Sequence, residues 1–351
     1  MKKIVFADLK EFCRQALLAE GVQEQSAETV VDSLALTDAF GMHSHGTKNL
    51  FDYLRKADAG ALDKNALPAV EKETPAVALV DGHNTFGMVS STFAMELAIE
   101  KARNLGIGAV CVHNSEHFGA AGGYVLKAAE AGLIGLAMSN VDANMTIPGA
   151  RGMVIGNNPV AYAIPTARHD PIFLDIALST IASLKVIQAR KDGRSVPEGW
   201  ITDGRGYPTT DPSHYPDEGA MLPMAGHKGY GLALLVETMT SILSNSPFMT
   251  DVHSWLFNMD EPNRVSHTFV CVNPAMFSDI DGFKARMDEA IDRIHSTPRA
   301  DYCERLYYPG EIEWGHYHKA MEGGLELPDD VVTSLEKLAA KTGISVPWMN
   351  K

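Results

Sequence analysis

Cysteine is scarce in this chain of 351 residues, and long apolar runs are absent. The four cysteines, Cys13, Cys111, Cys271 and Cys303, form no CxxC pair, which argues against a disulfide framework and a zinc knuckle. No apolar stretch reaches the roughly 18 residues that a membrane span needs, and the apolar run at the amino terminus is too short for a signal peptide. We therefore expect a cytoplasmic protein with reduced thiols and no membrane segment.

Basic residues are also too few for a protein that binds nucleic acid. The chain has 30 lysines and arginines against 44 acidic residues, which gives a formal net charge of −14. We expect no nucleic-acid partner, because such a protein needs a basic surface. An anionic small molecule remains compatible with this charge, since a lysine or a helix amino terminus makes a site locally positive.

Hydrophobic periodicity predicts an α/β fold. The chain is longer than a single hydrophobic core usually accommodates, so we expect two or three subdomains. Helical spacing predicts helices at 9–17, 26–38 and 50–57, with a capping box at Asp8 to Glu11 and a cap at Ser26. Beyond residue 75 strands and helices alternate, which is typical of an α/β sandwich.

The later elements are predicted from β-rich runs and from further helical spacing. Strands are expected at 76–81, 107–112, 133–139, 160–164, 172–176 and 266–272. Helices are expected at 88–105, 121–131, 178–191, 229–244 and 279–296, with a short polar helix after Pro328. The sections 140–159 and 192–228 are loop-rich, and long loops are often functional.

Residues 41–46 place His43, Ser44 and His45 between the second and third predicted helices. Histidine titrates near neutral pH and is the commonest general acid or base. The flanking glycines let the backbone approach a ligand closely. The pattern indicates a proton-transfer site, and a structural or solvated loop histidine is the alternative.

A second histidine cluster spans residues 113–123, between a predicted strand and a predicted helix. Enzymes of the α/β class place catalytic groups at such turns, so His117 is a candidate second acid or base. His113 and His117 also have the i, i+4 spacing of a zinc helix, with Glu116 between them, although the order differs from H-E-x-x-H. A zinc-dependent hydrolase is therefore the alternative from another functional class. The non-functional alternative is a loop histidine whose hydrogen bonds are made within the protein.

A third segment, residues 224–231, opens an apolar helix with Lys228 and Gly229 at its start. Backbone N–H groups and a lysine at that point suit a phosphate or a carboxylate. The spacing is not that of a Walker A loop, and the chain contains no G-x-G-x-x-G, so a dinucleotide would bind by a route other than the Rossmann one. Three weaker segments are 151–159, 175–177 at a strand end, and 309–311, a tripeptide typical of a surface loop.

In the order HSHG, HFGAAG, GNNP, LDIA, GHKGYG and PGE, these segments resemble the malate and L-lactate dehydrogenase family, which is distinct from the Rossmann dehydrogenases. Residues 206–212 and 272–277 are most similar to its ureidoglycolate dehydrogenase branch. The resemblance implies a homodimer and an α/β fold whose non-Rossmann nucleotide-binding domain has a largely antiparallel sheet. The implied parts are a helical subdomain at 1–70 joined by 312–351, a substrate-side α/β subdomain at 71–120, and an NAD(P)-binding domain at 121–311.

Carried over by residue, the resemblance implies that Ser44, His45 and His117 are catalytic. Ser44 and His45 match the family's catalytic motif, and His117 matches the histidine that accepts the proton in some members. We expect His45 to be the acid/base and His117 to be its partner or alternative. The implied enzyme is an NAD(P)-dependent dehydrogenase acting on CH–OH groups, with NAD as the expected cofactor and NADP still open. The residues on cofactor-lining segments are Ser139, Asp175, Ile176, Ala177, Lys228, Gly229, Pro309, Gly310 and Glu311.

One position departs from the family pattern. Many members carry an arginine three residues after the HSHG glycine, where it can clamp a substrate carboxylate, but this chain has Asn49. Lys48 is adjacent but faces elsewhere on a helix, and His43 is the remaining polar group on the substrate side. We expect a small anionic substrate of the 2-hydroxy acid class, of the malate, lactate, ureidoglycolate or sulfolactate type. The alternatives are a reductase of a cyclic imine carboxylate or diketo sugar acid, and a non-catalytic binding protein.

Overall fold

The computed structural model describes residues 1–349, and its amino-terminal part is helical. The helices are α1 (Phe6–Ala19), α2 (Glu24–Ala39) and α3 (Leu50–Asp58). All three were predicted, but both predicted caps are wrong. The helix α1 begins directly after Val5, which puts Asp8 in its first turn, and α2 begins after Gln23, so Ser26 lies buried inside the helix. Asp8 still complements the positive end of the helix dipole.

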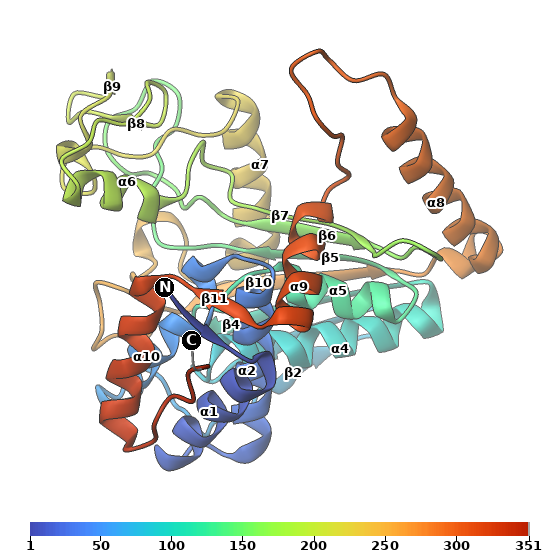
Figure 1. Ribbon diagram of the computed structural model, residues 1–351, viewed down its shortest axis with the longest axis horizontal. Coiled ribbons are helices and arrows are strands. Elements are labelled where there is room, and N and C mark those ends of the chain that lie inside the picture. Colours follow the sequence, from blue (N-terminus) through green and yellow to red (C-terminus); the bar gives the residue numbers. More distant parts are fainter. Residues whose placement is uncertain (350–351) are drawn as a thin grey trace.

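The two ends of the chain join this helical part (Figure 1). Strand β1 (Lys2–Ile4) pairs antiparallel with β11 (Leu325–Leu327). The helix α10 (Asp329–Thr342) packs on α1 and α3, and α9 (Glu311–Gly323) packs on α2. One apolar core therefore contains buried residues from both ends, among them Leu9, Leu17, Val331 and Leu335.

A seven-stranded sheet in the order β2-β3-β4-β10-β5-β6-β7 forms the rest of the framework. Its strands are β2 (Ala69–Glu73), β3 (Val77–Asp81), β4 (Ile107–Ser115), β5 (Ile134–Ser139), β6 (Val160–Ile164), β7 (Ile172–Ile176) and β10 (Val265–Val272). Only β3 and β4 pair in parallel, which confirms the largely antiparallel sheet. The strand β2 was not predicted, because it is an exposed edge strand whose charged residues give no apolar alternation.

Helices cover both faces of this sheet (Figure 1). The helices α4 (Gly87–Leu105) and α5 (Gly122–Glu130) pack on one face against Val110, Ala137 and Phe269. The other face carries α6 (Ser183–Lys191), α7 (His227–Glu237) and the small hairpin of β8 (Ile201–Thr202) and β9 (Pro208–Thr209), and it contacts Met138 and Val270. Successive side chains along β5 and β10 point to opposite faces of the sheet, so these strands contribute to two separate apolar cores.

Two predicted helices start at different residues from those expected. The helix α6 begins at Ser183 rather than near 178, because the N–H groups of Leu178 and Thr180 bond the carbonyls of Asn157 and Leu222. The helix α7 begins at His227 and continues as a π turn over Thr238–Ile242. Both changes leave the predicted order of strands and helices intact.

The helix α8 (Ile280–Ser296) projects from the sheet as an arm in Figure 1. The chain returns from this arm through residues 297–310 to α9. The seven-stranded sheet contains strands from both sides of residue 120 in the sequence. The division of the chain into subdomains at that residue therefore stays a prediction. No helix within residues 1–349 is long and apolar enough to cross a membrane.

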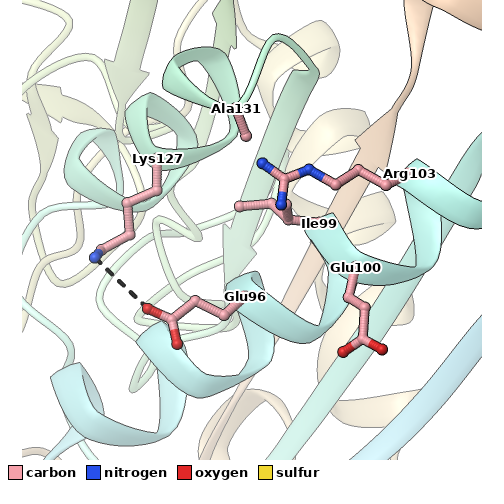
Figure 2. Close-up of a pocket in the computed structure, with 6 residues that line it drawn as sticks. All are labelled: Glu96, Ile99, Glu100, Arg103, Lys127 and Ala131. Atoms are coloured by element: carbon pink, nitrogen blue, oxygen red, sulfur yellow. Dashed lines mark ion pairs between the residues drawn. The ribbon is translucent and has the colours of Figure 1, made fainter.

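A surface hollow lies between α4 and α5 (Figure 2). Lys127 and Glu96 close one side of it with an ion pair at 3.8 Å, and Arg103 lies across from them. These residues lie in the middle and toward the carboxyl-terminal ends of α4 and α5. The two histidine motifs lie near the amino-terminal ends of these helices. The hollow is therefore a charged surface feature apart from the histidines.

Candidate active site

The first histidine motif folds as two short 3-10 turns, η1 (His43–His45) and η2 (Thr47–Asn49), between α2 and α3. The buried carboxylate of Asp38 organises both turns. Its Oδ2 accepts hydrogen bonds from N and Oγ1 of Thr47 at 2.8 and 2.6 Å, and its Oδ1 lies 2.9 Å from Nδ1 of His43. A Cβ at Gly46 would lie 2.2 Å from Asp38 Oδ1, so only glycine fits there. His43 therefore belongs to the support of the motif.

Ser44 and His45 form a hydrogen-bonded pair, with Ser44 Oγ 2.8 Å from His45 Nδ1. Asn49 is buried and donates from Nδ2 to the carbonyl oxygen of Ser44 at 3.0 Å, so it braces the turn. Burial, helped by the charge of Lys48, lowers the pKa of His45 to about 4. The His45 ring is therefore neutral at physiological pH.

The structure brings His117 to His45, with ring centroids 5.7 Å apart. His117 follows the end of β4, and Tyr53 of α3 places its hydroxyl 2.5 Å from His117 Nδ1. The indole of Trp255 stacks on the His117 ring at 4.2 Å and 9°. Burial and the neighbouring rings of His45 and His267 lower the pKa of His117 well below its usual value. His117 is thus also neutral.

The Nε2 atoms of His45 and His117 are the free nitrogens of the pair. Each ring uses Nδ1 for a hydroxyl partner, Ser44 or Tyr53, and no hydrogen bond within residues 1–349 engages either Nε2. A neutral imidazole with one bonded nitrogen can exchange a proton at the other. Two such groups side by side can accept or donate a proton at a common substrate atom.

A third histidine supports this arrangement from the sheet. His267 on β10 lies fully buried, with Nδ1 2.9 Å from Ser139 Oγ and Nε2 2.9 Å from Ser115 Oγ. Its ring stacks on Phe118 at 4.4 Å, and burial lowers its pKa to about 3. His267 was not predicted as a site residue, since one histidine in an apolar strand carries no motif. The hydroxyl of Ser139, expected on the cofactor side, is occupied by this network.

A buried ion pair lies next to His117. Lys56 Nζ is 3.3 Å from Glu116 Oε2, and the two side chains are only 1% and 2% exposed. Burial raises the pKa of Glu116 to about 7, against the opposing effect of Lys56. This pair was also missed, because Lys56 belongs to a helix whose spacing shows only an apolar face, while Glu116 was weighed only against a zinc pattern.

Two of the segments expected to line a cofactor contact each other along β7, and the start of α5 joins them there. Asp175 Oδ2 accepts a hydrogen bond from the N–H of Gly122, at the start of α5, at 2.7 Å, and burial raises the pKa of Asp175 to about 6. The carbonyl of Pro309 accepts from Phe173 N at 3.1 Å. Gly310 has φ 92°, and a Cβ there would lie 2.5 Å from the Phe173 ring. Pro309 and Gly310 form a turn in which Gly310 is the N-cap residue of α9.

The segment of Ile176 and Ala177 continues from β7 toward Lys228 and Gly229. The carbonyl of Leu178 accepts from Met224 N at 2.9 Å, shortly before α7 begins. A Cβ at Gly229 would lie 2.2 Å from the carbonyl oxygen of Met224, while Lys228 is exposed in the first turn of α7. The helix start and its lysine are thus open to an anion.

Two other predicted residues form ion pairs with partners outside the histidine pair. Lys48 bonds Asp330 of α10 at 2.8 Å, and Glu311 pairs with His295 at 2.9 Å and with Arg305.

His113 lies on β4, with Nε2 2.7 Å from Glu71 on β2. His113 and His117 therefore do not share a helix face. No three histidine, cysteine or acidic side chains within residues 1–349 are grouped so that they could hold a metal ion.

The comparisons with known proteins agree on one family. A sequence model described as malate/L-lactate dehydrogenase matches residues 4–336. The chain is 34% identical over 345 residues to a malate dehydrogenase of Pyrococcus abyssi, covering 96% of this chain and 94% of that protein. It is 30% identical over 329 residues to the ureidoglycolate dehydrogenase (NAD(+)) of Escherichia coli K12, covering 94% and 93%.

The fold agrees with the sequence relationship. The crystal structure of malate dehydrogenase from Entamoeba histolytica superposes with a TM-score of 0.92 and 29% sequence identity, covering 99% of each chain. The resemblance drawn from the six ordered segments is therefore confirmed. The chain belongs to the malate/L-lactate dehydrogenase family of oxidoreductases.

Proposed function

We propose that this protein is a nicotinamide-dependent dehydrogenase that interconverts a small 2-hydroxy acid and its 2-oxo acid by hydride transfer. The observation that carries the proposal is the pair of neutral histidines, His45 and His117, whose ring centroids lie 5.7 Å apart and whose Nε2 atoms make no hydrogen bond within residues 1–349. Oxidation of a secondary alcohol needs a group that removes the hydroxyl proton while a hydride leaves the same carbon. Family membership supports the same reaction class.

In the oxidation direction the substrate hydroxyl gives its proton to Nε2 of His45. Nδ1–H of the neutral ring donates to Ser44 Oγ, which fixes the ring and leaves the Nε2 lone pair available. His117 is held in the same way by Tyr53 and is the partner or alternative base. A bound nicotinamide would supply the hydride acceptor for this step. In the reverse direction the protonated histidine returns the proton to the oxygen.

The residues that would hold the cofactor are Asp175, Ile176, Ala177, Lys228, Gly229 and the turn Pro309 to Glu311. The glycines at 229 and 310 pack where any side chain would clash, so they bring the neighbouring backbone close to those segments. Lys228 at the start of α7 suits a phosphate. We favour NAD because the ureidoglycolate dehydrogenase relative carries NAD(+) in its name, and NADP is the competing choice.

The substrate class follows from the family and from Asn49. The side chain of Asn49 braces Ser44, so the clamp that an arginine provides in many members is missing at this position. The candidates are malate, lactate, ureidoglycolate and sulfolactate. Reduction of a cyclic imine carboxylate is the second reading, since it needs the same hydride and proton transfer to a C=N bond.

The decisive experiment is a panel of these acids, their oxo forms and the cyclic imine carboxylates, each assayed with NAD(H) and NADP(H). Turnover of one member with either cofactor is the expected result. The cofactor alone should also raise the melting temperature, because binding to the folded state stabilises it by mass action. No turnover together with no thermal shift would overturn the proposal.

We also propose that the protein is a cytoplasmic homodimer that uses the outer face of α7. Leu232, Leu235, Ile242 and Leu243 lie on this face and its π turn, and each is at least 46% exposed. Several exposed large apolar residues on one helix and its continuation suit an interaction surface, and the family resemblance implies a dimer. Light scattering of the wild type and of Leu235→Asp tests it: a dimer that becomes monomeric is expected, and a monomeric wild type contradicts it.

A further inference from the structure

One loop carries an aromatic residue directly onto the proposed acid/base pair. Trp255 stacks on His117 at 4.2 Å with nearly parallel rings, and its ring centroid lies 5.6 Å from that of Tyr53. The loop lies between the short turn η5 (Met249–Asp251) and β10. Its other large aromatic, Phe257, is 68% exposed and has no such role.

The buried Lys56–Glu116 pair fastens this loop to the body of the protein. Lys56 Nζ donates to the carbonyl oxygens of Glu261 at 2.7 Å and Asn258 at 3.4 Å. Glu116 Oε1 accepts from the backbone N–H of Asn263 at 2.7 Å. The loop is thus held at three backbone points by two side chains that almost no water reaches, one of which is the neighbour of His117.

We infer that Trp255 is a specificity-determining residue: its indole, fixed by Lys56 and Glu116, closes one side of the substrate site and restricts it to short-chain acids. This inference rests on the proposed function. It names a restriction on the substrate that family membership does not supply.

The geometry gives the reason. At 4.2 Å the two stacked rings are in van der Waals contact, so no substrate group fits between Trp255 and His117. One face of His117 is covered and its Nδ1 is bonded to Tyr53, which leaves the Nε2 edge for the substrate. A longer substrate chain would have to displace the indole, and the three clamped backbone points resist that displacement.

The test compares Trp255→Ala with Phe257→Ala, a matched control on the same loop. Substrates are the best acid of the panel and its homologues lengthened by one to three methylene groups. One methylene in a filled pocket changes kcat/KM by about 10- to 200-fold. We therefore expect Trp255→Ala to raise the ratio of kcat/KM for the longest over the shortest substrate by at least about tenfold. Phe257→Ala should leave this ratio within about twofold of the wild type.

An active Trp255→Ala enzyme with an unchanged ratio would overturn the inference while leaving the proposed function intact. A wild type without turnover on any acid would overturn both. If Trp255→Ala does not fold, Trp255→Phe decides, because a smaller ring keeps the stack; its ratio should rise by about threefold, and no change again overturns the inference.

The role of Lys56 in holding the loop is tested separately, with the same kcat/KM ratio. Lys56→Met should shift the same ratio in the direction of Trp255→Ala, because the loop carbonyls lose their donor, and Lys56→Arg should restore most of the wild-type ratio. A merely structural role for Lys56 would lower stability in both variants without moving chain-length preference. That outcome would remove Lys56 as a positioning residue.

Discussion

The hydroxyl of Tyr53 lies 2.5 Å from Nδ1 of His117, so a residue of the third helix sets the orientation of a histidine 64 positions away. The contact joins the helical part to the sheet at the point where β4 ends. It also occupies Nδ1 of His117, so that Nε2 is the nitrogen left without a hydrogen bond within residues 1–349.

Replacing Tyr53 by phenylalanine should therefore lower kcat by about tenfold with little effect on KM, because the ring remains and only the orienting bond is lost. Steady-state kinetics with the best substrate measure this. Tyr302→Phe is the control, since that side chain is 93% exposed. Equal activity of the two variants would show that Tyr53 does not position His117.

His45→Ala should lower kcat by about 100-fold or more while cofactor binding, followed by thermal shift, survives. His117→Gln should also reduce kcat, and the larger loss identifies the principal acid/base. His113→Gln is the matched control from the same segment, because His113 faces Glu71 on β2. Near-normal turnover of His45→Ala would remove His45 from the proposed role.

Asp38→Ala should lower the free energy of unfolding by about 3 kcal/mol, because the buried N–H and hydroxyl of Thr47 lose their acceptor. The exposed Asp32, which pairs with Lys10, gives a comparison on the same helix. Asp32→Ala should cost less than about 1 kcal/mol. Urea unfolding measures both, and similar losses would mean that Asp38 does not organise the motif.

Acid should destabilise the protein through His267. Burial lowers the folded-state pKa of His267 from 6.5 to about 3, so its contribution to stability is complete above pH 6.5 and is lost as the pH falls toward 3. The loss from this ring between pH 7 and pH 5 is about 2 kcal/mol. Urea unfolding of His267→Gln at both pH values should show a smaller drop than the wild type by that amount. Parallel losses in the two proteins would contradict the prediction.

The order of elements was predictable because apolar spacing reports which face of a helix or strand is buried. The strands at 160–164 and 172–176 match β6 and β7. Helix starts were less predictable: Ser26 and Asp8 are good capping residues, yet α1 begins three residues before its first buried residue, Leu9, and α2 begins two residues before Ser26. The helix α9 was not predicted at all, since its start was taken for a surface loop.

The residues of the candidate site were predictable where they lie close together in the sequence. Residues that only tertiary packing brings to the site were not. Ser44, His45 and His117 stand in short motifs with glycines. Tyr53 and Trp255 contact His117 only through tertiary packing, and nothing in their neighbours along the chain indicates it. Asn49 was expected to face the substrate, and its hydrogen bond to Ser44 became evident only from the turn geometry.

The contact between η2 and α10 has a consequence for how the protein matures. Lys48 bonds Asp330 across 282 positions, and its carbonyl accepts a hydrogen bond from Ser334. Because synthesis runs from the amino terminus, the turn beside the proposed acid/base leaves the ribosome long before the helix that braces it. The brace on this turn is therefore complete only after α10 has been synthesised and has packed on it.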